Sequence, residues 1–146
     1  VQLKLMNYEA ELTEIVARAQ KEELMEAHLK QIADRWKEVE LEFDQHKASD
    51  VYLARLSADD DLMLEEHQML VQDMAGSRYL DAVLRKDQYG PVTFGAEVSL
   101  WHRKLFAMSE VLGALAEIQR AWAYLETLFI GSDEVREELP ETAEQF

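Results

Sequence analysis

The chain has 146 residues, a length typical of one domain, and 48% of them are hydrophobic. Its 15 Lys and Arg residues against 30 Asp and Glu residues give a net charge of −15, so nucleic acids and anionic membrane surfaces should repel it. It has no cysteine, which excludes a disulfide framework, a thiolate zinc site and a cysteine nucleophile.

The two ends of the sequence lie within amphipathic patterns. The first residues carry no signal peptide, and no apolar run approaches the roughly 20 residues of a membrane-spanning helix. We therefore expect a soluble chain that binds neither membranes nor nucleic acid. Because it begins at Val1 inside a helical pattern and ends at Phe146 inside another, we expect an internal piece of a longer polypeptide.

The first predicted element is a long helix over residues 5–36. Its apolar residues recur at intervals of three and four, and no Gly or Pro interrupts them. They are Leu5, Tyr8, Leu12, Ile15, Val16, Ala19, Met25, Leu29, Ile32 and Trp36. The pattern slips once, at Lys21-Glu22-Glu23, so the sequence predicts one helix with a single phase shift.

A β-hairpin and a second helix are predicted next. Val39, Leu41 and Phe43 alternate with acidic residues, and β-branched and aromatic residues follow a polar loop, which predicts a short hairpin over residues 39–54. From Ser57 to Asp60 the sequence resembles a capping box with Asp in the place of Glu. We expect the helix that it opens to span residues 58–85.

A loop and two further helices complete the expected order. A Gly-Pro pair and a second Gly predict a loop over residues 86–95. Apolar residues at threes and fours then predict a long helix over residues 96–130. Gly131 suits its end and Ser132 suits the next N-cap, while Pro140 bars continuation, so a short helix is expected over residues 133–139. The predicted fold class is mainly α: an elongated helical bundle with one hairpin, forming a single segment over residues 1–146.

No motif for catalysis, cofactor binding or metal binding is present in the sequence. The four histidines have no Glu three residues before them, as a di-iron bundle would need, and no HExxH occurs. No GxxxxGK[ST] or GxGxxG cradle occurs for phosphates. Ser99 lies near His102, but no third group orients them as a nucleophile and base. We therefore expect no catalytic, cofactor or metal site in this segment.

The stretch IQRAWAYLETLFIGSDEVREELPETAEQF, residues 118–146, resembles the linker region of dynein heavy chains, above all the axonemal outer-arm type. The run AQKEELMEAHLKQIADRW, residues 19–36, resembles the same family. The residues that we take as its structural signature are Trp36, Trp101, Gln119, Trp122, Leu125, Glu126, Phe129, Leu139 and Pro140. Two features depart from the family pattern: Leu115 replaces a usual Trp, and the Gly-Pro loop lengthens the stretch before Trp101.

The resemblance implies a mechanical function. In dyneins the linker is a mostly helical rod that follows the tail and lies across a ring of AAA+ modules. ATP binding and hydrolysis in the ring make it bend and straighten, which is the power stroke. This chain would be the N-terminal part of the linker, and ATP and Mg would belong to the AAA+ ring of the parent chain.

The resemblance also implies partners and a location. The partners would be the AAA+ ring and tail of the same heavy chain, with other dynein subunits and microtubules reached through the parent. The location would be the cytoplasm, the cytoskeleton and the axoneme of a cilium or flagellum.

Two other interpretations of the residues stay open. One is a static helical interaction or tethering module, although the hairpin and the phase shift argue against a plain coiled coil. The other is a small helical enzyme or metal carrier, which lacks every motif it would need. P-loops further along the same polypeptide would favour the motor over the static module.

Overall fold

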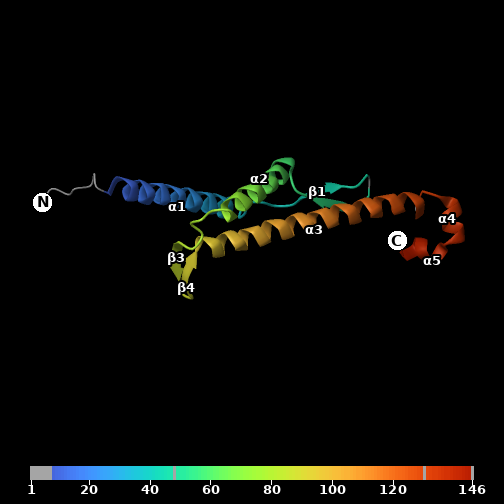
Figure 1. Cartoon of the computed structure of the whole chain (residues 1–146). Coiled ribbons are helices and arrows are strands. Elements are labelled where there is room, and N and C mark those ends of the chain that lie inside the picture. Colours follow the sequence, from blue (N-terminus) through green and yellow to red (C-terminus); the bar gives the residue numbers. More distant parts are fainter. Residues whose placement is uncertain (1–7, 48, 130, 146) are drawn as a thin grey trace. The chain divides into compact units, whose positions relative to one another are not determined.

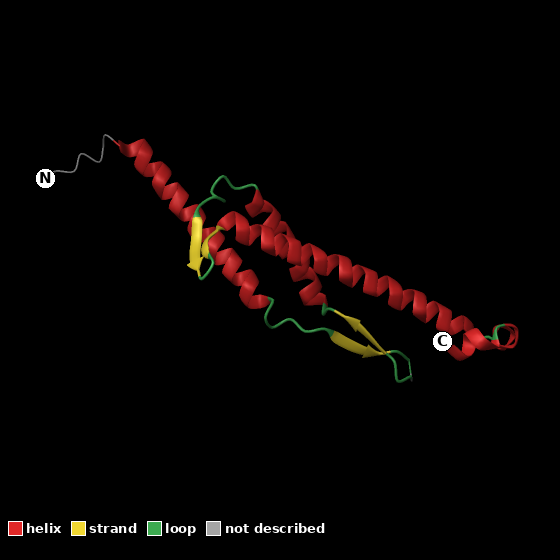
Figure 2. Ribbon diagram, turned by 90° about the horizontal axis from the view of Figure 1, so that it is seen from below, coloured by secondary structure: helices red, strands yellow, loops and turns green. Residues whose placement is uncertain are grey.

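A computed structural model describes residues 8–47, 49–129 and 131–145. Helices predominate, and two antiparallel strand pairs lie among them (Figures 1 and 2). The mainly-α class is therefore confirmed. The chain divides into two compact units, one of Val1–Glu40 with Ala58–Phe106 and the other of Leu41–Ser57 with Ala107–Phe146. Each unit is described separately.

The core of the first unit lies between long helices. Helix α1 spans Glu9–Arg35, close to the predicted 5–36, of which residues 5–7 lie outside the described part. It packs against α2, Ala58–Ala75 (Figure 1). The buried apolar residues are Met25, Leu29, Ile32, Met63, Leu64, Val71, Met74, Phe94, Val98, Trp101 and Leu105. They follow the helical periodicity of the sequence, so burial of one face holds these helices in place.

Helix α2 ends earlier than predicted. It stops at Ala75, so the expected helix over residues 58–85 was wrong over residues 76–85. The Gly76 N–H donates to the Asp73 carbonyl over 3.1 Å, and the Ser77 N–H donates to Met74 over 2.9 Å. These bonds tighten the last turn, and glycine stabilises a helix interior less than other residues do. The helix therefore ends just before Gly76.

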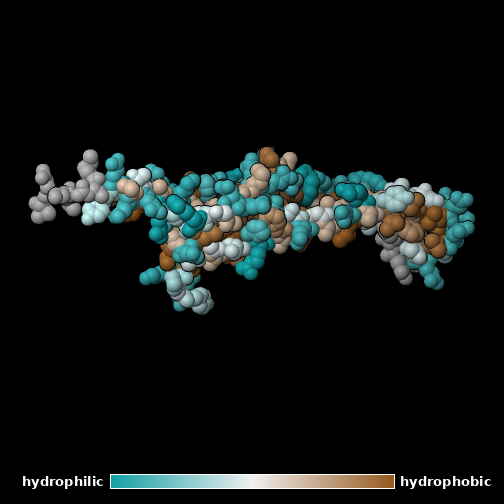
Figure 3. Space-filling view, in the orientation of Figure 1, coloured by the Kyte–Doolittle hydropathy of each residue, from teal (hydrophilic) through white to brown (hydrophobic). Residues whose placement is uncertain are grey.

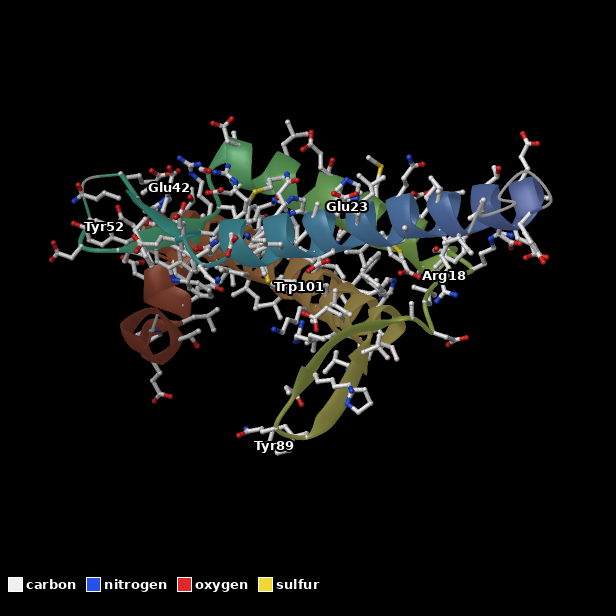
Figure 4. The ribbon with its side chains drawn as sticks, turned by 90° about the vertical axis from the view of Figure 1, so that its left-hand side faces the viewer. Arg18, Glu23, Glu42, Tyr52, Tyr89 and Trp101 are labelled. Atoms are coloured by element: carbon white, nitrogen blue, oxygen red, sulfur yellow. The ribbon has the colours of Figure 1, made fainter. Side chains whose placement is uncertain are left out.

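The predicted loop over residues 86–95 is instead the greater part of a second hairpin. Strand β3, Val83–Asp87, pairs antiparallel with β4, Gly90–Thr93. Gly90 has a φ of 119°, a conformation that glycine adopts without steric cost. Pro91 is tolerated because a two-stranded sheet has only edge strands. Tyr89 lies at the tip of this hairpin (Figure 4).

Helix α3 spans Phe94–Phe129, slightly earlier at its start than the predicted residue 96. The Ala96 N–H donates to Thr93 Oγ1 over 3.2 Å, which satisfies one free donor of the first turn. At the other end, the Gly131 N–H donates to the Thr127 carbonyl over 3.2 Å. A Cβ on Gly131 would collide with that carbonyl oxygen, so this helix end requires glycine. The first part of α3 belongs to the first unit and the rest to the second.

The hairpin of the second unit lies where the sequence predicts it. Strand β1, Glu42–Gln45, pairs antiparallel with β2, Tyr52–Arg55. Phe43 lies opposite Ala54 in this register. Both strands fall within or next to the predicted range 39–54, because the alternation of apolar and acidic residues is a local signal.

Two short helices follow α3. Helix α4, Asp133–Glu138, begins at the predicted N-cap Ser132, whose hydroxyl accepts from the Val135 N–H over 3.4 Å. Pro140 ends α4 as predicted but also opens a further helix, α5, Pro140–Gln145. Proline favours the first helical position, where its missing N–H costs nothing. The sequence prediction treated Pro140 only as the end of a helix and therefore missed α5.

Apolar side chains reach the surface near this end of the chain. Figure 3 shows brown atoms where α3 ends and α4 begins. Leu125, Leu128 and Leu139 are among the exposed large apolar residues. None of the helices within the described ranges is long and apolar enough to cross a bilayer.

Candidate functional site

The side chain of Gln119 on α3 completes the open edge of strand β2. Its Oε1 accepts from the Ala54 N–H over 2.6 Å, and its Nε2 donates to the Ala54 carbonyl over 2.9 Å. An amide that offers one donor and one acceptor in this way imitates the pairing of a neighbouring strand. Both backbone groups of Ala54 are thus satisfied, and the register of the hairpin on the helix is fixed.

Glu126, two helical turns further along α3, receives the tip of the same hairpin. The Lys47 ammonium lies 2.6 Å from Glu126 Oε2, and His46 Nε2 lies 2.8 Å from the same oxygen. Because an ionised carboxylate only accepts, His46 Nε2 acts as donor here. Hydrogen bonds from Lys47 and then from His46 hold the pKa of the Glu126 carboxyl below its ordinary value. Glu126 is therefore a buried carboxylate that stays ionised because two donors face it.

Trp122 lies between these two attachment points on α3. The His46 ring meets the Trp122 ring edge to face, with 5.2 Å between ring centroids and an interplanar angle of 71°. Gln119, Trp122 and Glu126 are three and four residues apart, so they share one face of the helix. We call the set Gln119, Trp122, Glu126, His46, Lys47 and Ala54 the hairpin clamp.

The backbone at the hairpin tip is shaped for this contact. Lys47 has a φ of 54°, a left-handed conformation that is uncommon for a residue other than glycine. The His46 N–H donates to the Val51 carbonyl over 2.8 Å, which closes the loop between the strands. A strained lysine persists only where surrounding contacts hold it, and its ion pair with Glu126 is such a contact.

Charges on the hairpin itself stiffen the two strands. Arg55 of β2 pairs with Glu42 over 2.8 Å and with Asp44 over 2.5 Å. Asp44 through its hydrogen bond, and then the charges of both carboxylates, raise the pKa of Arg55. Glu42 and Tyr52 lie on this hairpin in Figure 4. Each exposed pair contributes little alone, but together they cross-link the strands that the clamp holds.

The structure brings together three of the nine signature residues. Gln119, Trp122 and Glu126 meet at the clamp, whereas Leu125 is 38% exposed on the same helix. Leu139 caps α4 and Pro140 opens α5. Phe129 is the last residue of α3.

Two signature tryptophans belong to the first unit. The Trp36 indole N–H donates to Nδ1 of buried His67 over 3.0 Å. Trp101 is buried under the Lys104 ammonium, which lies 4.8 Å from its ring centroid, and the Trp101 Nε1 has no hydrogen-bond partner among the described residues. Both residues thus stabilise the core of that unit.

Sequence reasoning missed the partners of the signature residues. His46 and His67 stood out only as scattered histidines, and Lys47 carried no signal. A left-handed lysine cannot be read from the sequence, and Ala54 takes part only through its backbone. The Q-x-x-W-x-x-x-E spacing was the available signal, since it places three side chains of different chemistry on one helix face.

The chemistry of the clamp is that of attachment. Within the described ranges, no three His, Asp or Glu side chains gather in a way that would hold a metal ion. The donors and acceptors of the clamp are directed at one another. What the arrangement accomplishes is to fasten a hairpin to a helix through one amide and one carboxylate.

Comparison with known proteins gives this arrangement a context. The family model for dynein heavy chain, N-terminal region 2, matches residues 1–146. The chain is 42% identical over 144 residues to the dynein alpha chain, flagellar outer arm, of Chlamydomonas reinhardtii. It is 34% identical over 148 residues to dynein axonemal heavy chain 9 of Homo sapiens and 32% over 144 residues to the ciliary dynein beta chain of Tripneustes gratilla. These matches cover 99%, 100% and 99% of this chain but only 3% of each relative.

Proposed function

Because the chain belongs to the dynein heavy chain family through its N-terminal region 2, we propose that it is a non-catalytic, force-transmitting segment of a ciliary or flagellar motor. Its role is that of part of the linker, which passes ATP-driven changes of an AAA+ ring to the tail. The relatives are named as flagellar outer-arm, axonemal and ciliary dyneins, which supports a place in the cytoskeleton of the axoneme.

The hairpin clamp is the observation that carries this proposal. Gln119 and Glu126 hold the hairpin at points about 10 Å apart along α3. A hairpin attached at one point can pivot, whereas one attached at two points resists both rotation and sliding. The amide fixes register and the carboxylate adds charge-assisted hydrogen bonds. A segment that bears load needs such cross-connections, because isolated strand pairs are marginally stable.

In this role, nucleotide binding and force transmission belong to different parts of the parent heavy chain. ATP and Mg bind in the AAA+ modules of the heavy chain, and this segment couples mechanically to that ring and to the tail. Other dynein subunits and microtubules are reached through the parent. The sequence supports the division, since no phosphate-binding motif lies within the 146 residues.

The test weakens the clamp in the full-length heavy chain. Gln119→Ala combined with Glu126→Ala should leave ATP turnover in place and slow microtubule gliding, so that less movement results from each ATP. The matched control is Val111→Ala combined with Ile118→Ala, because both residues are 66% exposed on α3. Circular dichroism of the variants checks that the helices persist. Unchanged gliding velocity and ATP turnover in the clamp variant would instead support a static tethering module.

A further inference from the structure

Helix α1 presents apolar residues on two different faces. Met25, Leu29 and Ile32 are 5%, 4% and 0% exposed and lie in the core of the first unit. Leu12, Ile15 and Val16 are 38%, 61% and 54% exposed. At about 100° per residue, the second group lies roughly a third of a turn away from the first. The helix is continuous from Glu9 to Arg35, so the phase shift in the sequence turns the apolar face to a new direction.

The N-terminal face has no cover within the described part of the chain. We call Leu12, Ile15, Val16 and Ala19 the α1 stripe; their spacing of three and four is that of a helix–helix seam. Toward the N-terminus, the face of α1 that carries Met25, Leu29 and Ile32 becomes polar. There Glu14, Arg18 and Lys21 lie beside the segment Arg78–Ala82. Three large aliphatic side chains in one exposed row indicate a surface made for contact.

The borders of the α1 stripe are mainly acidic. Glu9 borders one side, Glu11 and Glu22 border the other, and Glu23 lies at its end. Arg18 lies about 20° from Glu11 around the helix and pairs with Glu22 over 2.6 Å, so on that border Glu11 is the acidic residue without this pairing. Figure 4 shows Arg18 and Glu23 on different sides of α1. The complement of this surface is therefore an apolar stripe bordered by Lys and Arg.

We propose that the α1 stripe docks an amphipathic helix with basic flanks, contributed by another part of the same heavy chain. A second copy of this chain is unsuited, since each copy carries a net charge of −15 and brings the same acidic borders. An anionic membrane surface is repelled by those borders as well.

The size of the stripe points to a tethered partner. From Leu12 to Ala19 the stripe extends over about 11 Å, or two turns of one helix. A freely diffusing protein buries roughly 800 Å² per partner, commonly spread over about 20 to 30 residues, whereas the stripe has four. A helix on the same chain needs less area because its effective concentration is high. The assignment of the docked helix to the same heavy chain rests on the proposed function, in which the 146 residues are a small part of that chain. The match to 3% of each relative agrees with this size.

Amide hydrogen exchange compares the full-length heavy chain with its Ile15→Glu variant. Amides of residues 12–19 should exchange at least about tenfold faster in the variant, because the docked helix no longer suppresses opening. Met69→Glu, at a residue that is 67% exposed on α2, should leave their exchange unchanged. Equal exchange in the unsubstituted chain and the Ile15→Glu variant would overturn the proposal.

Charge and source are tested separately. Glu11→Lys should reduce the exchange protection of residues 12–19, whereas Glu14→Lys, on the polar side of α1, should not. Equal effects of the two substitutions would contradict the proposal that the docked helix has basic flanks. A photoreactive residue in place of Ile15 should cross-link in the heavy chain to one helical segment rich in Lys and Arg. Cross-links to a separate polypeptide or to lipid would contradict the proposal that the docked helix comes from the same heavy chain. None of these measurements depends on ATP turnover or gliding, so failure here is distinct from failure of the proposed function.

Discussion

The indole N–H of Trp36 donates to Nδ1 of His67 over 3.0 Å, and this bond fixes the protonation of a buried imidazole. With Nδ1 as acceptor, a neutral His67 carries its proton on Nε2. The two rings also meet edge to face, with 6.2 Å between centroids. The pair joins the end of α1 to α2, and protonation at Nδ1 would remove the acceptor.

The first unit should lose stability as the pH falls below about 6.5. Burial lowers the pKa of His67, and the charge of Arg35 lowers it further while Glu66 opposes the shift. The unfolded chain therefore binds this proton more readily, so stability is complete above the unfolded pKa and declines below it. Urea unfolding between pH 8 and pH 5 measures the slope. His67→Asn, which keeps an acceptor without titrating, should flatten it; an equal slope would contradict the assignment.

Trp36 and His67 should be energetically coupled. Trp36→Phe keeps the ring but removes the N–H, and we expect a loss of about 1 to 2 kcal/mol because buried His67 loses its donor. His67→Leu leaves the Trp36 N–H unpaired instead. Urea unfolding of both single variants and the double variant completes the cycle. A coupling energy near zero would show that the hydrogen bond does not contribute to stability.

The attachment of the hairpin to α3 should weaken when either the donor or the acceptor of the Gln119 amide is lost. Gln119→Ala removes two hydrogen bonds, for an expected loss of about 1 to 3 kcal/mol from the second unit. Gln119→Glu keeps an acceptor for the Ala54 N–H but sets a carboxylate against the Ala54 carbonyl. The Ala54 amide should exchange faster in both variants, as measured by NMR. Ile118→Ala is the control, and a glutamate variant with native exchange would refute the bidentate pairing.

The hairpin should detach from α3 in acid. The pKa of Glu126 is lowered by Lys47 and His46, so its contribution is complete above the ordinary value of 4.5 and is lost as the pH falls through the folded value. Hydrogen exchange of the hairpin between pH 6 and pH 3, corrected for intrinsic rates, reports the loss. Glu126→Gln should remove this pH dependence. Hairpin protection that stays constant down to pH 3 in the native chain would count against the clamp.

Two glycines of the α3 region should respond in opposite ways to alanine. Gly131→Ala places a Cβ against the Thr127 carbonyl, and we expect a loss of about 1 to 3 kcal/mol. Gly113→Ala meets nothing within 4 Å and lies in the helix interior, so it should stabilise α3 by about 0.5 to 1 kcal/mol. Thermal melting followed by circular dichroism measures both. Equal changes would mean that the α3 end does not require glycine.

Local signals in the sequence determined most of the secondary structure. Helices α1 and α3 and the first hairpin follow from apolar periods of three and four or of two, because such periods need no knowledge of distant residues. The errors lie where local rules compete. Gly76 ended a helix that the apolar pattern seemed to continue, and Gly90-Pro91 formed a hairpin instead of a loop. The charge of −15 and the absent cysteines excluded whole classes of function.

Only the tertiary structure decided which side chains meet. Gln119 reaches Ala54 and Glu126 reaches His46, pairs that lie 65 and 80 positions apart in the chain. Their meeting depends on the left-handed backbone at Lys47 and on the placement of a hairpin beside one helix face. The sequence marked Gln119, Trp122 and Glu126 through spacing, but a period cannot name a partner. Hydrogen bonds and ion pairs act over a few ångströms, so the fold had to bring these atoms together before the clamp existed.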